Sequence, residues 1–378
     1  MQVTIIGGGM IAHDQLLPSF YQLQRLGMVE AIAVCARHES TLQALAASAT
    51  IQRAFPGQNF RSLTEPYRGA IARMPPHNLV VIAIPDHLHF DAIMAALEAD
   101  QHVLAVKPLV LRVAESEVIA QEALRRGLFV GIEYHKRFDD RSLMARRKYR
   151  AGDFGEFRLG AACLMEKWYY RHSNFQNWCT TENSDAFTYI GCHYVDLVHF
   201  ITGLMPVSVS VYGIKDQYPN GREGFLWTDA RIIWNNGACL NVQNSLGCPD
   251  GAPGTNMQGL TLYCAGSNNG ALLRHSDQYR GLEYVYNESS VYAEPSPDYF
   301  QYVDLGGGGL TPVGYGYRSI EYLLRCCLRV ESAPDRQQAI RQIDEEGIAA
   351  TPANSRYNEQ VIEAARQSIL NAGATVAT

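Results

Sequence analysis

The sequence predicts an α/β fold, with an N-terminal doubly wound parallel sheet and a C-terminal α+β domain that carries an open, mostly antiparallel sheet. Two observations support this prediction. In residues 1–132, short and continuously apolar runs alternate with helical stretches, as in parallel strands that helices cover on both faces. Further along, strand-like segments follow one another with turn residues such as Pro219-Asn220-Gly221 between them, which is typical of antiparallel sheets.

Five apolar runs in the N-terminal third are interpreted as strands. Helical periodicity or a turn residue follows each run, and the connections between them are short enough for βαβ units. The runs are Val3–Ile6, Ala31–Cys35, Leu79–Ile84, Val103–Val106 and Leu128–Ile132. Their continuous apolar character predicts strands that are buried on both faces of a parallel sheet.

The sequence changes character from about residue 133. Four further strands are expected, separated by turns such as Asn235-Asn236-Gly237. They are Phe157–Leu164, Val207–Tyr212, Ala238–Asn244 and Leu260–Cys264. One long helix, from about Asp185 to Thr202, interrupts these strands and ends at Gly203, and residues 317–330 and 358–370 are helical again.

Composition excludes several classes of protein. The chain has 378 residues, of which 47% are hydrophobic, and a formal net charge of −6, so it lacks the positive charge that nucleic acid or anionic lipid would attract. No apolar run approaches the ~20 residues that span a bilayer, and the N-terminus does not resemble a secretory signal. The nine cysteines show no CxxC spacing, which argues against a structural zinc site and a disulfide framework. We expect a cytoplasmic protein without membrane or nucleic-acid partners.

A glycine-rich turn directly follows the first expected strand. Gly7-Gly8-Gly9-Met10-Ile11-Ala12 fits the pattern G-x-G-x-x-A, in which the first glycine allows a tight turn and the second lets a pyrophosphate approach the backbone. A helix that begins at Met10 and Ile11 would hold the phosphate with its free N–H groups. A structural glycine turn without a ligand is the alternative. The position of the pattern within a βαβ unit favours nucleotide binding.

The end of the second expected strand bears on the choice of cofactor. NAD-binding domains of this type place Asp or Glu there to hold the ribose 2′-hydroxyl, but here the sequence reads Ala36-Arg37-His38. An arginine can pair with the 2′-phosphate of NADP, and it can also stack on adenine in an NAD enzyme. We therefore expect an NAD(P) site, with NADP slightly favoured over NAD.

Three further motifs lie at the ends of expected elements. Pro85-Asp86-His87-Leu88-His89 follows the run that ends at Ile84, Lys107-Pro108 follows the next run, and Ile190–Asp196 lies on the long helix. Together with the glycine turn, these motifs resemble those of the Gfo/Idh/MocA oxidoreductase family, which includes glucose-fructose oxidoreductase and inositol dehydrogenase. The resemblance extends over almost the whole chain.

The resemblance implies a domain organisation and an activity. Residues 1–132 would form a Rossmann dinucleotide-binding domain, residues 133–350 a substrate-binding α+β domain with an open sheet, and residues 351–378 a C-terminal helix that packs back on the Rossmann domain. The implied activity is NAD(P)-dependent hydride transfer to or from a secondary alcohol of a sugar, glycoside or cyclitol. The resemblance also implies a homo-oligomer, either a dimer or a tetramer, that forms through the open sheet.

The resemblance also assigns catalytic roles. Lys107 matches the family's catalytic lysine, His193 its catalytic histidine, and Asp196 the helix aspartate that helps to bind substrate. An ammonium can stabilise a developing alkoxide, and an imidazole with an unperturbed pKa of ~6.5 can take the hydroxyl proton. Tyr189 lies one helical turn before His193 and is expected to act as a proton relay or as a hydrogen-bonding partner of the substrate.

The sequence departs from the family pattern at two positions. Val106 precedes Lys107 where the family usually has Glu, and Tyr189 stands where the family usually has Asp. These departures keep open a second activity, in which an NAD-dependent enzyme cleaves a glycoside through transient oxidation and elimination without net turnover of added NAD(P). A non-catalytic sugar or nucleotide sensor is a further alternative, against which the retained Lys107 and His193 argue.

The remaining expected site residues come from the same reasoning. The aromatic and basic stretch before the long helix suits stacking on a sugar ring, with core packing or an oligomer interface as the alternative. The expected cofactor-binding residues are Gly7, Gly9, Met10, Ile11, Ala36, Arg37, His38, Ile84, Pro85, His87, His89, Lys107 and Pro108. The expected substrate-binding residues are Lys107, Tyr134, His135, Arg137, Trp168, Tyr169, Arg171, Trp178, Tyr189, His193 and Asp196. His193, Asp196 and His199 share a helical stripe, but we expect no metal because no companion cluster is visible.

Overall fold

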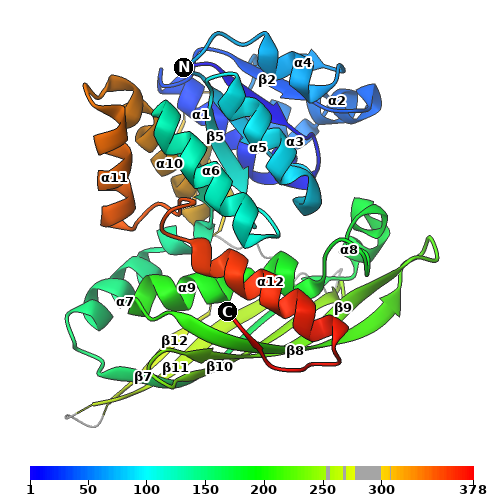
Figure 1. Cartoon of the computed structure of the whole chain (residues 1–378). Helices are drawn as coiled ribbons and strands as arrows, with labels where there is room; N and C mark the ends of the chain where they lie inside the picture. Colours follow the sequence, from blue (N-terminus) through cyan, green and yellow to red (C-terminus); the bar gives the residue numbers. More distant parts are fainter. Residues whose placement is uncertain (253–255, 267–269, 277–298, 307) are drawn as a thin grey trace. The chain divides into compact units, whose positions relative to one another are not determined.

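The computed structural model describes residues 1–252, 256–266, 270–276, 299–306 and 308–378 (Figure 1). The chain divides into two units, each built from separate segments of the sequence. Unit 1 consists of Met1–Val110, Ala114–His135 and Tyr299–Arg356, and unit 2 consists of Leu111–Val113, Lys136–Asp298 and Tyr357–Thr378. Each unit contains one large sheet, and the two are described separately.

Unit 1 contains a six-stranded sheet in the order β3-β2-β1-β4-β5-β6, with every neighbouring pair parallel. The strands are β1 (Val3–Ile6), β2 (Ile32–Cys35), β3 (Arg61–Leu63), β4 (Leu79–Ile82), β5 (His102–Val106) and β6 (Val130–Glu133). The order reverses direction at β1 and β4, as in the Rossmann fold, so the predicted doubly wound sheet is confirmed. β3 is not predicted from the sequence, because this short edge strand has no apolar run.

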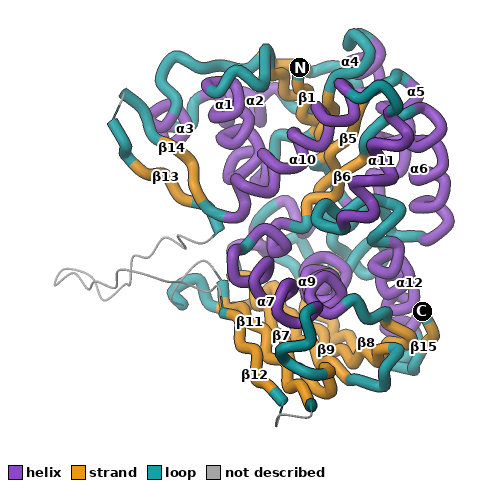
Figure 2. The backbone as a smooth tube through the Cα atoms, turned by 90° about the vertical axis from the view of Figure 1, so that its left-hand side faces the viewer, coloured by secondary structure: helices purple, strands orange, loops and turns teal. Residues whose placement is uncertain are grey.

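Helices surround the sheet of unit 1. They are α1 (Leu17–Arg25), α2 (Glu39–Ala46), α3 (Ala49–Ala54), α4 (Tyr67–Ala72), α5 (His89–Glu98), α6 (Val113–Arg126), α10 (Tyr315–Ser332) and α11 (Arg336–Glu346). A short ribbon of β13 (Gln301–Val303) and β14 (Thr311–Val313) lies beside α1 and α10 (Figure 2). Helix α10 packs closely on β6, because a Cβ at Gly131 would lie 2.9 Å from Leu323 Cδ2. The core of unit 1 therefore includes side chains from residues after 299.

Unit 2 contains a seven-stranded sheet in the order β12-β11-β7-β10-β9-β8-β15. The strands are β7 (Glu156–Lys167), β8 (Pro206–Gln217), β9 (Glu223–Trp234), β10 (Cys239–Cys248), β11 (Met257–Ala265), β12 (Ala271–His275) and β15 (Val376–Ala377). Among the described strands of this sheet, β7 and β10 pair in parallel and all other neighbours pair antiparallel, so the predicted open and mostly antiparallel sheet is confirmed.

Four α-helices accompany this sheet within the described part of unit 2. They are α7 (Asp140–Arg150), α8 (Tyr169–His172), α9 (Cys192–Thr202) and α12 (Arg356–Leu370). Figures 1 and 2 show α7, α9 and α12 on the same side of the sheet. Gly203 ends α9 with a φ of +79°, a left-handed conformation that glycine adopts without strain. The other side of the sheet carries no described helix, which leaves that face open.

The two units divide the chain differently from the expected domain boundaries. We expected residues 351–378 to pack back on the Rossmann domain, but α12 belongs to unit 2, where Val211 N–H donates to Ser368 Oγ at 2.8 Å. Helices α10 and α11, which we expected in the substrate-binding domain, belong to unit 1. Both differences arise because the chain returns to unit 1 over Tyr299–Arg356 and then continues in unit 2 from Tyr357, and the linear pattern of strands and helices does not record these crossings. Within the described residues, no helix combines the length and the apolar character that a membrane crossing requires.

Candidate active site

The glycine turn lies between β1 and the first helical segment of unit 1. Gly7 has a φ of +110°, and a Cβ there would lie 2.0 Å from the carbonyl oxygen of Ala83, so only glycine fits. Gly9 is exposed, and among the described residues beyond its chain neighbours no atom lies within 4 Å of the position that a Cβ would take. The helix begins directly afterwards at Met10 and Ile11. This open space beside helical N–H groups fits a dinucleotide pyrophosphate.

The carboxyl end of β2 has the residues expected beside the adenosine ribose. Ala36 is buried, whereas Arg37 and His38 are exposed, and His38 is the N-cap of α2. Glu39, the first residue of α2, is also exposed. Ala36 therefore lies next to the guanidinium of Arg37 and close to the start of α2. A guanidinium and a helix N-terminus both favour an anionic group of a ligand.

His89 connects the carboxyl ends of β4 and β5. Its imidazole is fully buried, with Nδ1 2.9 Å from the carbonyl oxygen of Pro108 and Nε2 2.9 Å from that of Ile84. We expected His89 on the cofactor side or at a helix start, and it is the first residue of α5, where its ring contacts two backbone carbonyl groups. His87, two residues earlier, is exposed, and Pro85 is half-buried.

Lys107 follows β5 directly and is half-buried at the same edge of the sheet as the glycine turn. The peptide bond to Pro108 is cis, and Pro108 itself is buried. Because ligands of open α/β sheets bind beyond the carboxyl ends of the strands, this edge is where a catalytic lysine and a cofactor would meet. The structure therefore brings Gly9, Pro85 and Lys107 to one edge of unit 1.

The end of β6 carries a buried polar network that the sequence patterns do not predict. Glu133 is 2% exposed and accepts hydrogen bonds from Gln15 Nε2 at 2.9 Å and Ser319 Oγ at 2.7 Å. Its other oxygen lies 2.9 Å from His135 Nδ1. Tyr134, between them in the sequence, is buried. The signal that could have revealed Glu133 is a carboxylate that ends an apolar strand.

The expected catalytic residues of unit 2 lie where a helix changes its pitch. Residues Phe187–Gly191 form a π-helical turn that leads into α9, so the predicted single regular helix is interrupted at Tyr189. His193 is 4% exposed in the first turn of α9. The ring of Tyr189 packs on Phe175 at 4.7 Å and on Trp178 at 5.9 Å between centroids. Wide helical turns of this kind are frequent at functional sites.

Asp196 and Arg137 form a buried ion pair within unit 2. Arg137 Nε donates to Asp196 Oδ2 at 2.8 Å, and Nη2 donates to Oδ1 at 2.6 Å. The hydroxyl of Tyr357 and the amide of Asn358 donate to the same carboxylate. Because Arg137 is 2% and Asp196 1% exposed, the structure uses these two expected substrate ligands to join η3 (His135–Phe138), α9 and α12.

The aromatic and basic stretch before α9 divides into an exposed and a buried part. Trp168 and Tyr169 are exposed, at 39% and 56%. Arg171 is buried, with its guanidinium 4.0 Å from the Trp168 ring centroid and a hydrogen bond to the carbonyl of Gln217. Trp178 is half-buried against Tyr189. The structure thus brings Trp178 and Tyr189 together, while Arg171 supports the ring of Trp168.

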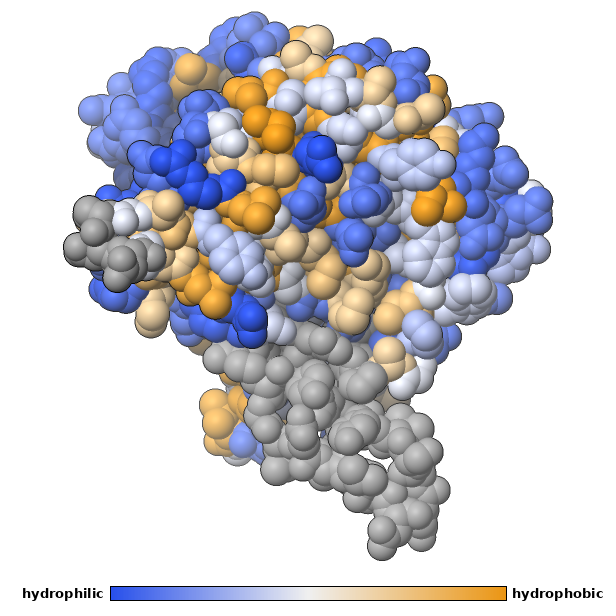
Figure 3. All heavy atoms as spheres, turned by 90° about the horizontal axis from the view of Figure 1, so that it is seen from below, coloured by the Kyte–Doolittle hydropathy of each residue, from blue (hydrophilic) through white to orange (hydrophobic). Residues whose placement is uncertain are grey.

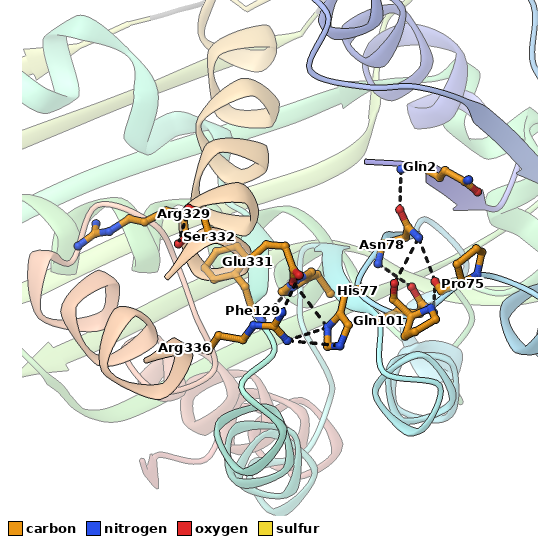
Figure 4. A network of polar contacts seen from close by, with 12 residues as sticks. Gln2, Pro75, His77, Asn78, Gln101, Phe129, Arg329, Glu331, Ser332 and Arg336 are labelled. Atoms are coloured by element: carbon orange, nitrogen blue, oxygen red, sulfur yellow. Dashed lines mark hydrogen bonds and ion pairs between the residues drawn. The ribbon is translucent and has the colours of Figure 1, made fainter. Parts of the chain in front are cut away.

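A group of potential metal ligands lies elsewhere in unit 1 (Figure 4). In the described part of the chain, the ligand atoms of His77, His102 and Glu331 lie within 4.8 Å of one another. The backbone N–H of Phe129 donates to His102 Nδ1 at 2.9 Å, so the ring proton of neutral His102 is on Nε2, which lies 3.1 Å from Glu331 Oε2. A metal would need that nitrogen deprotonated, and Arg336 already donates to Glu331 Oε1 at 2.6 Å. This cluster is a hydrogen-bond network.

The helical stripe considered for a metal in the sequence is also engaged. His199 Nδ1 donates to the carbonyl of Leu204 at 2.8 Å, and Asp196 is held in its ion pair. Burial lowers the pKa of His199 to about 4, so its ring is neutral at pH 7. These contacts engage the buried Asp196 and the half-buried His199 within unit 2.

Two protein-family models match the chain in succession. The model described as the oxidoreductase family with an NAD-binding Rossmann fold matches residues 1–134, and that of the Gfo/Idh/MocA C-terminal domain matches residues 142–266. The chain belongs to the Gfo/Idh/MocA family. The predicted resemblance is therefore confirmed.

Curated relatives are about one-quarter identical to this Gfo/Idh/MocA protein over the segments that align. The D-glucoside 3-dehydrogenase of Escherichia coli (strain K12) is 24% identical over 221 residues, which cover 57% of this chain and 58% of that protein. The NADP-dependent scyllo-inositol 2-dehydrogenase of Bacillus subtilis (strain 168) is 24% identical over 142 residues, or 37% of this chain and 38% of that protein. The matched regions thus span less than two thirds of these relatives.

Solved structures of similar fold match this protein over its whole chain. GenD2 from gentamicin A biosynthesis, in complex with NAD, superposes with a TM-score of 0.71 at 16% identity, covering 100% of this chain and 96% of that one. The scyllo-inositol dehydrogenase of Lactobacillus casei, with bound NAD(H) and scyllo-inositol, gives a TM-score of 0.68 at 15% identity, covering 100% and 98%. At these identities the likeness establishes the Gfo/Idh/MocA fold.

Proposed function

We propose that the protein is an NAD(P)-dependent oxidoreductase that transfers hydride between nicotinamide and a secondary alcohol or ketone of a sugar, glycoside or cyclitol. The observation that carries the proposal is the shared edge of unit 1, where the open space at Gly9 and the ammonium of Lys107 both follow carboxyl ends of parallel strands. Membership of the family and the named activities of its members support the same conclusion.

The residues that would hold the dinucleotide come from three strand ends. Gly7 gives the tight turn, Gly9 leaves room for the pyrophosphate, and the N–H groups at Met10 and Ile11 would bind it. Ile84, Pro85, His87 and Pro108 would line the nicotinamide side, and Ala36, Arg37 and His38 the adenosine side. The bound cofactor supplies a hydride acceptor or donor.

The proposed chemistry needs one cation and one proton acceptor. Lys107 would stabilise the negative charge that develops on the carbinol oxygen, and His193 would take the hydroxyl proton as the carbonyl forms. Tyr189 would donate or accept a hydrogen bond at the substrate, with its ring held by Phe175 and Trp178. The exposed Trp168 and Tyr169 would stack on the sugar ring.

The experiment that tests this proposal measures absorbance of reduced nicotinamide with a panel of hexoses, glycosides and inositols. We expect Lys107→Ala and His193→Ala to abolish turnover while nucleotide binding, measured by fluorescence, stays within about twofold of wild type. Arg147→Ala, at an exposed position on α7, serves as control. Equal rates for Lys107→Ala and wild type would refute the assignment.

The cofactor preference has its own test. We propose that NADP is slightly favoured, because exposed Arg37 lies at the end of β2 next to the start of α2. Arg37→Ala is expected to weaken NADP binding more than NAD binding, since only NADP carries the 2′-phosphate that a guanidinium pairs with. An unchanged ratio of the two dissociation constants would show that Arg37 does not select the cofactor.

A second candidate function keeps the fold and changes the reaction. Tyr189, uncharged and packed on Phe175 and Trp178, stands at the family's usual Asp position. This departure favours a second candidate reaction, glycoside cleavage. In that reaction NAD would oxidise a hydroxyl transiently, the aglycone would be eliminated, and the hydride would return to the substrate. The measurement that separates the two is net reduction of added NAD(P), which the dehydrogenase requires and the cleavage cycle does not.

We also propose that the protein forms a homo-oligomer through the open face of the seven-stranded sheet. One row of directly paired residues crosses five strands of this sheet, from Leu272 through Tyr263, Leu159 and Cys239 to Ile233. The first three are at least 50% exposed on the face opposite the helices, and Figure 3 shows apolar residues among polar ones on the lower surface. Leu159→Glu is expected to reduce the mass measured by sedimentation equilibrium to that of a single chain, and an unchanged mass would contradict this.

A further inference from the structure

The carboxylate of Glu133 is buried in unit 1 and has a different partner on each oxygen. Oε1 accepts from Gln15 Nε2 at 2.9 Å and from Ser319 Oγ at 2.7 Å. Gln15 is itself fixed, since its Nε2 also donates to the carbonyl of Gly316 at 2.8 Å and its Oε1 accepts from Tyr299 O–H at 2.8 Å. Two donors therefore fix the orientation of Oε1.

The second oxygen of Glu133 faces an imidazole. His135 Nδ1 lies 2.9 Å from Glu133 Oε2, and because a carboxylate only accepts, Nδ1 carries the proton. In the neutral ring, the lone pair is then on Nε2. Tyr315 stacks on the ring with a 5.6 Å centroid separation and a 25° angle, and Tyr299 contacts it at 5.1 Å. These two rings restrict the plane of the imidazole, and the carboxylate restricts its tautomer.

This pair lies beside Lys107 in the sheet. Glu133 on β6 is the register partner of Val106 on β5, so Lys107 and His135 follow the carboxyl ends of neighbouring strands. Both residues belong to unit 1, so their relationship holds within one unit. The edge beyond these strand ends is where an open α/β sheet binds its ligand.

We propose that Glu133 is a positioning residue that holds His135 with its proton on Nδ1, so that Nε2 accepts a hydrogen bond from a substrate hydroxyl other than the one that reacts at Lys107. The inference rests on the proposed function and deepens it, because it makes the site selective for substrates that carry such a hydroxyl. A site that accepts a hydroxyl proton at a fixed position discriminates against an analogue that lacks that hydroxyl.

Glu133→Gln separates this role from simple packing. The amide has one accepting oxygen and one donating NH₂, and the two donors at Oε1 require the oxygen on their side. The NH₂ then faces His135, where it donates to Nδ1 and forces the ring proton onto Nε2. The variant keeps the shape of the side chain and reverses the hydrogen-bond polarity of the imidazole.

The first readout is the ¹⁵N NMR spectrum of the histidine rings in the full chain with NAD(P), assigned with His135→Gln. In the wild type we expect a protonated Nδ1 and an unprotonated Nε2 for His135, and in Glu133→Gln the reverse. A wild-type ring with its proton on Nε2 overturns the inference, whether or not the variant folds.

The second readout is the ratio of kcat/KM for the best polyol of the panel to that for its deoxy analogues. We expect Glu133→Gln to lower kcat/KM for the polyol about 10- to 100-fold, mostly through KM, and to remove the discrimination against one deoxy analogue. Glu331→Gln, which alters a separate carboxylate in unit 1, is expected to keep the wild-type ratio. Unchanged discrimination in an active Glu133→Gln overturns the inference and leaves the proposed function intact. A wild type without turnover on any polyol overturns both.

Discussion

The imidazole of His89 bridges the carbonyl oxygens of Pro108 and Ile84, each 2.9 Å from one ring nitrogen. Because a carbonyl oxygen only accepts, a ring nitrogen that carries a proton donates to the carbonyl beside it. Pro108 is bonded directly to Lys107, so the histidine fixes the backbone next to the proposed catalytic ammonium. This brace holds the ends of two neighbouring strands in place.

Replacement of His89 is therefore expected to damage both stability and turnover. His89→Phe removes both ring nitrogens and leaves a buried carbonyl group without its donor, which lowers the free energy of unfolding by about 1–3 kcal/mol. Urea denaturation followed by circular dichroism measures this loss, and His87→Phe, at an exposed position, is the control for stability. Equal denaturation midpoints for His89→Phe and wild type would show that the bridge contributes nothing.

The two glycines of the phosphate turn are expected to fail in different ways. At Gly7, the φ of +110° and the 2.0 Å approach to the Ala83 carbonyl mean that Gly7→Ala destabilises the fold. At Gly9 a side chain meets no protein atom within 4 Å, so Gly9→Val is expected to keep the melting temperature within a few degrees and to weaken NAD(P) binding at least tenfold. Calorimetric titration measures the second effect, and wild-type affinity in Gly9→Val would place the pyrophosphate elsewhere.

The ion pair of Arg137 and Asp196 is expected to stabilise unit 2. Arg137→Met leaves a carboxylate buried without its cation, and the loss in free energy of unfolding is expected to be about 3–5 kcal/mol. The double variant Arg137→Met, Asp196→Leu removes both charges and is expected to recover part of this loss. Urea unfolding of the three proteins measures the coupling. If Arg137→Met instead raises KM at unchanged stability, Arg137 contacts the substrate, as the sequence predicts.

His199 is expected to make the protein sensitive to acid. Burial lowers its pKa from 6.5 to about 4, so the unfolded chain binds the proton more tightly than the folded one. The stability linked to this group is complete above pH 6.5, decreases as the pH falls toward 4, and amounts to about 3 kcal/mol. His199→Gln removes the linkage, so the difference in unfolding free energy between variant and wild type is expected to change over this pH range. Parallel pH profiles would contradict the assignment.

The sequence predicts those parts of the fold that local patterns encode. Continuous apolar runs identify β1, β2, β4, β5 and β6, since buried parallel strands contain few polar residues. The edge strand β3 has two exposed residues among its three and carries no such signal. The pairing of β7 with β10 is parallel and distant in the sequence, so no hairpin turn records it.

In the candidate site too, the sequence predicts local motifs but not contacts between separate elements. The glycine turn is a local motif, and its φ and contacts are those that the pattern requires. The pairing of Arg137 with Asp196, and of Glu133 with Gln15 and Ser319, joins residues from separate elements, which spacing alone does not reveal. The π-helical turn at Tyr189 is likewise not predicted, because an apolar periodicity of 3.6 residues indicates only a regular α-helix.

The return of the chain to unit 1 has a consequence for biosynthesis. Leu323, Leu324 and Cys327 on α10 are fully buried in the core that β1 and α1 begin to build some 300 residues earlier. During synthesis, the strands of unit 1 emerge from the ribosome well before α10. Part of their apolar surface therefore stays exposed while the segment that forms most of unit 2 is made. A polypeptide released before residue 315 would therefore be a client for chaperones and proteases.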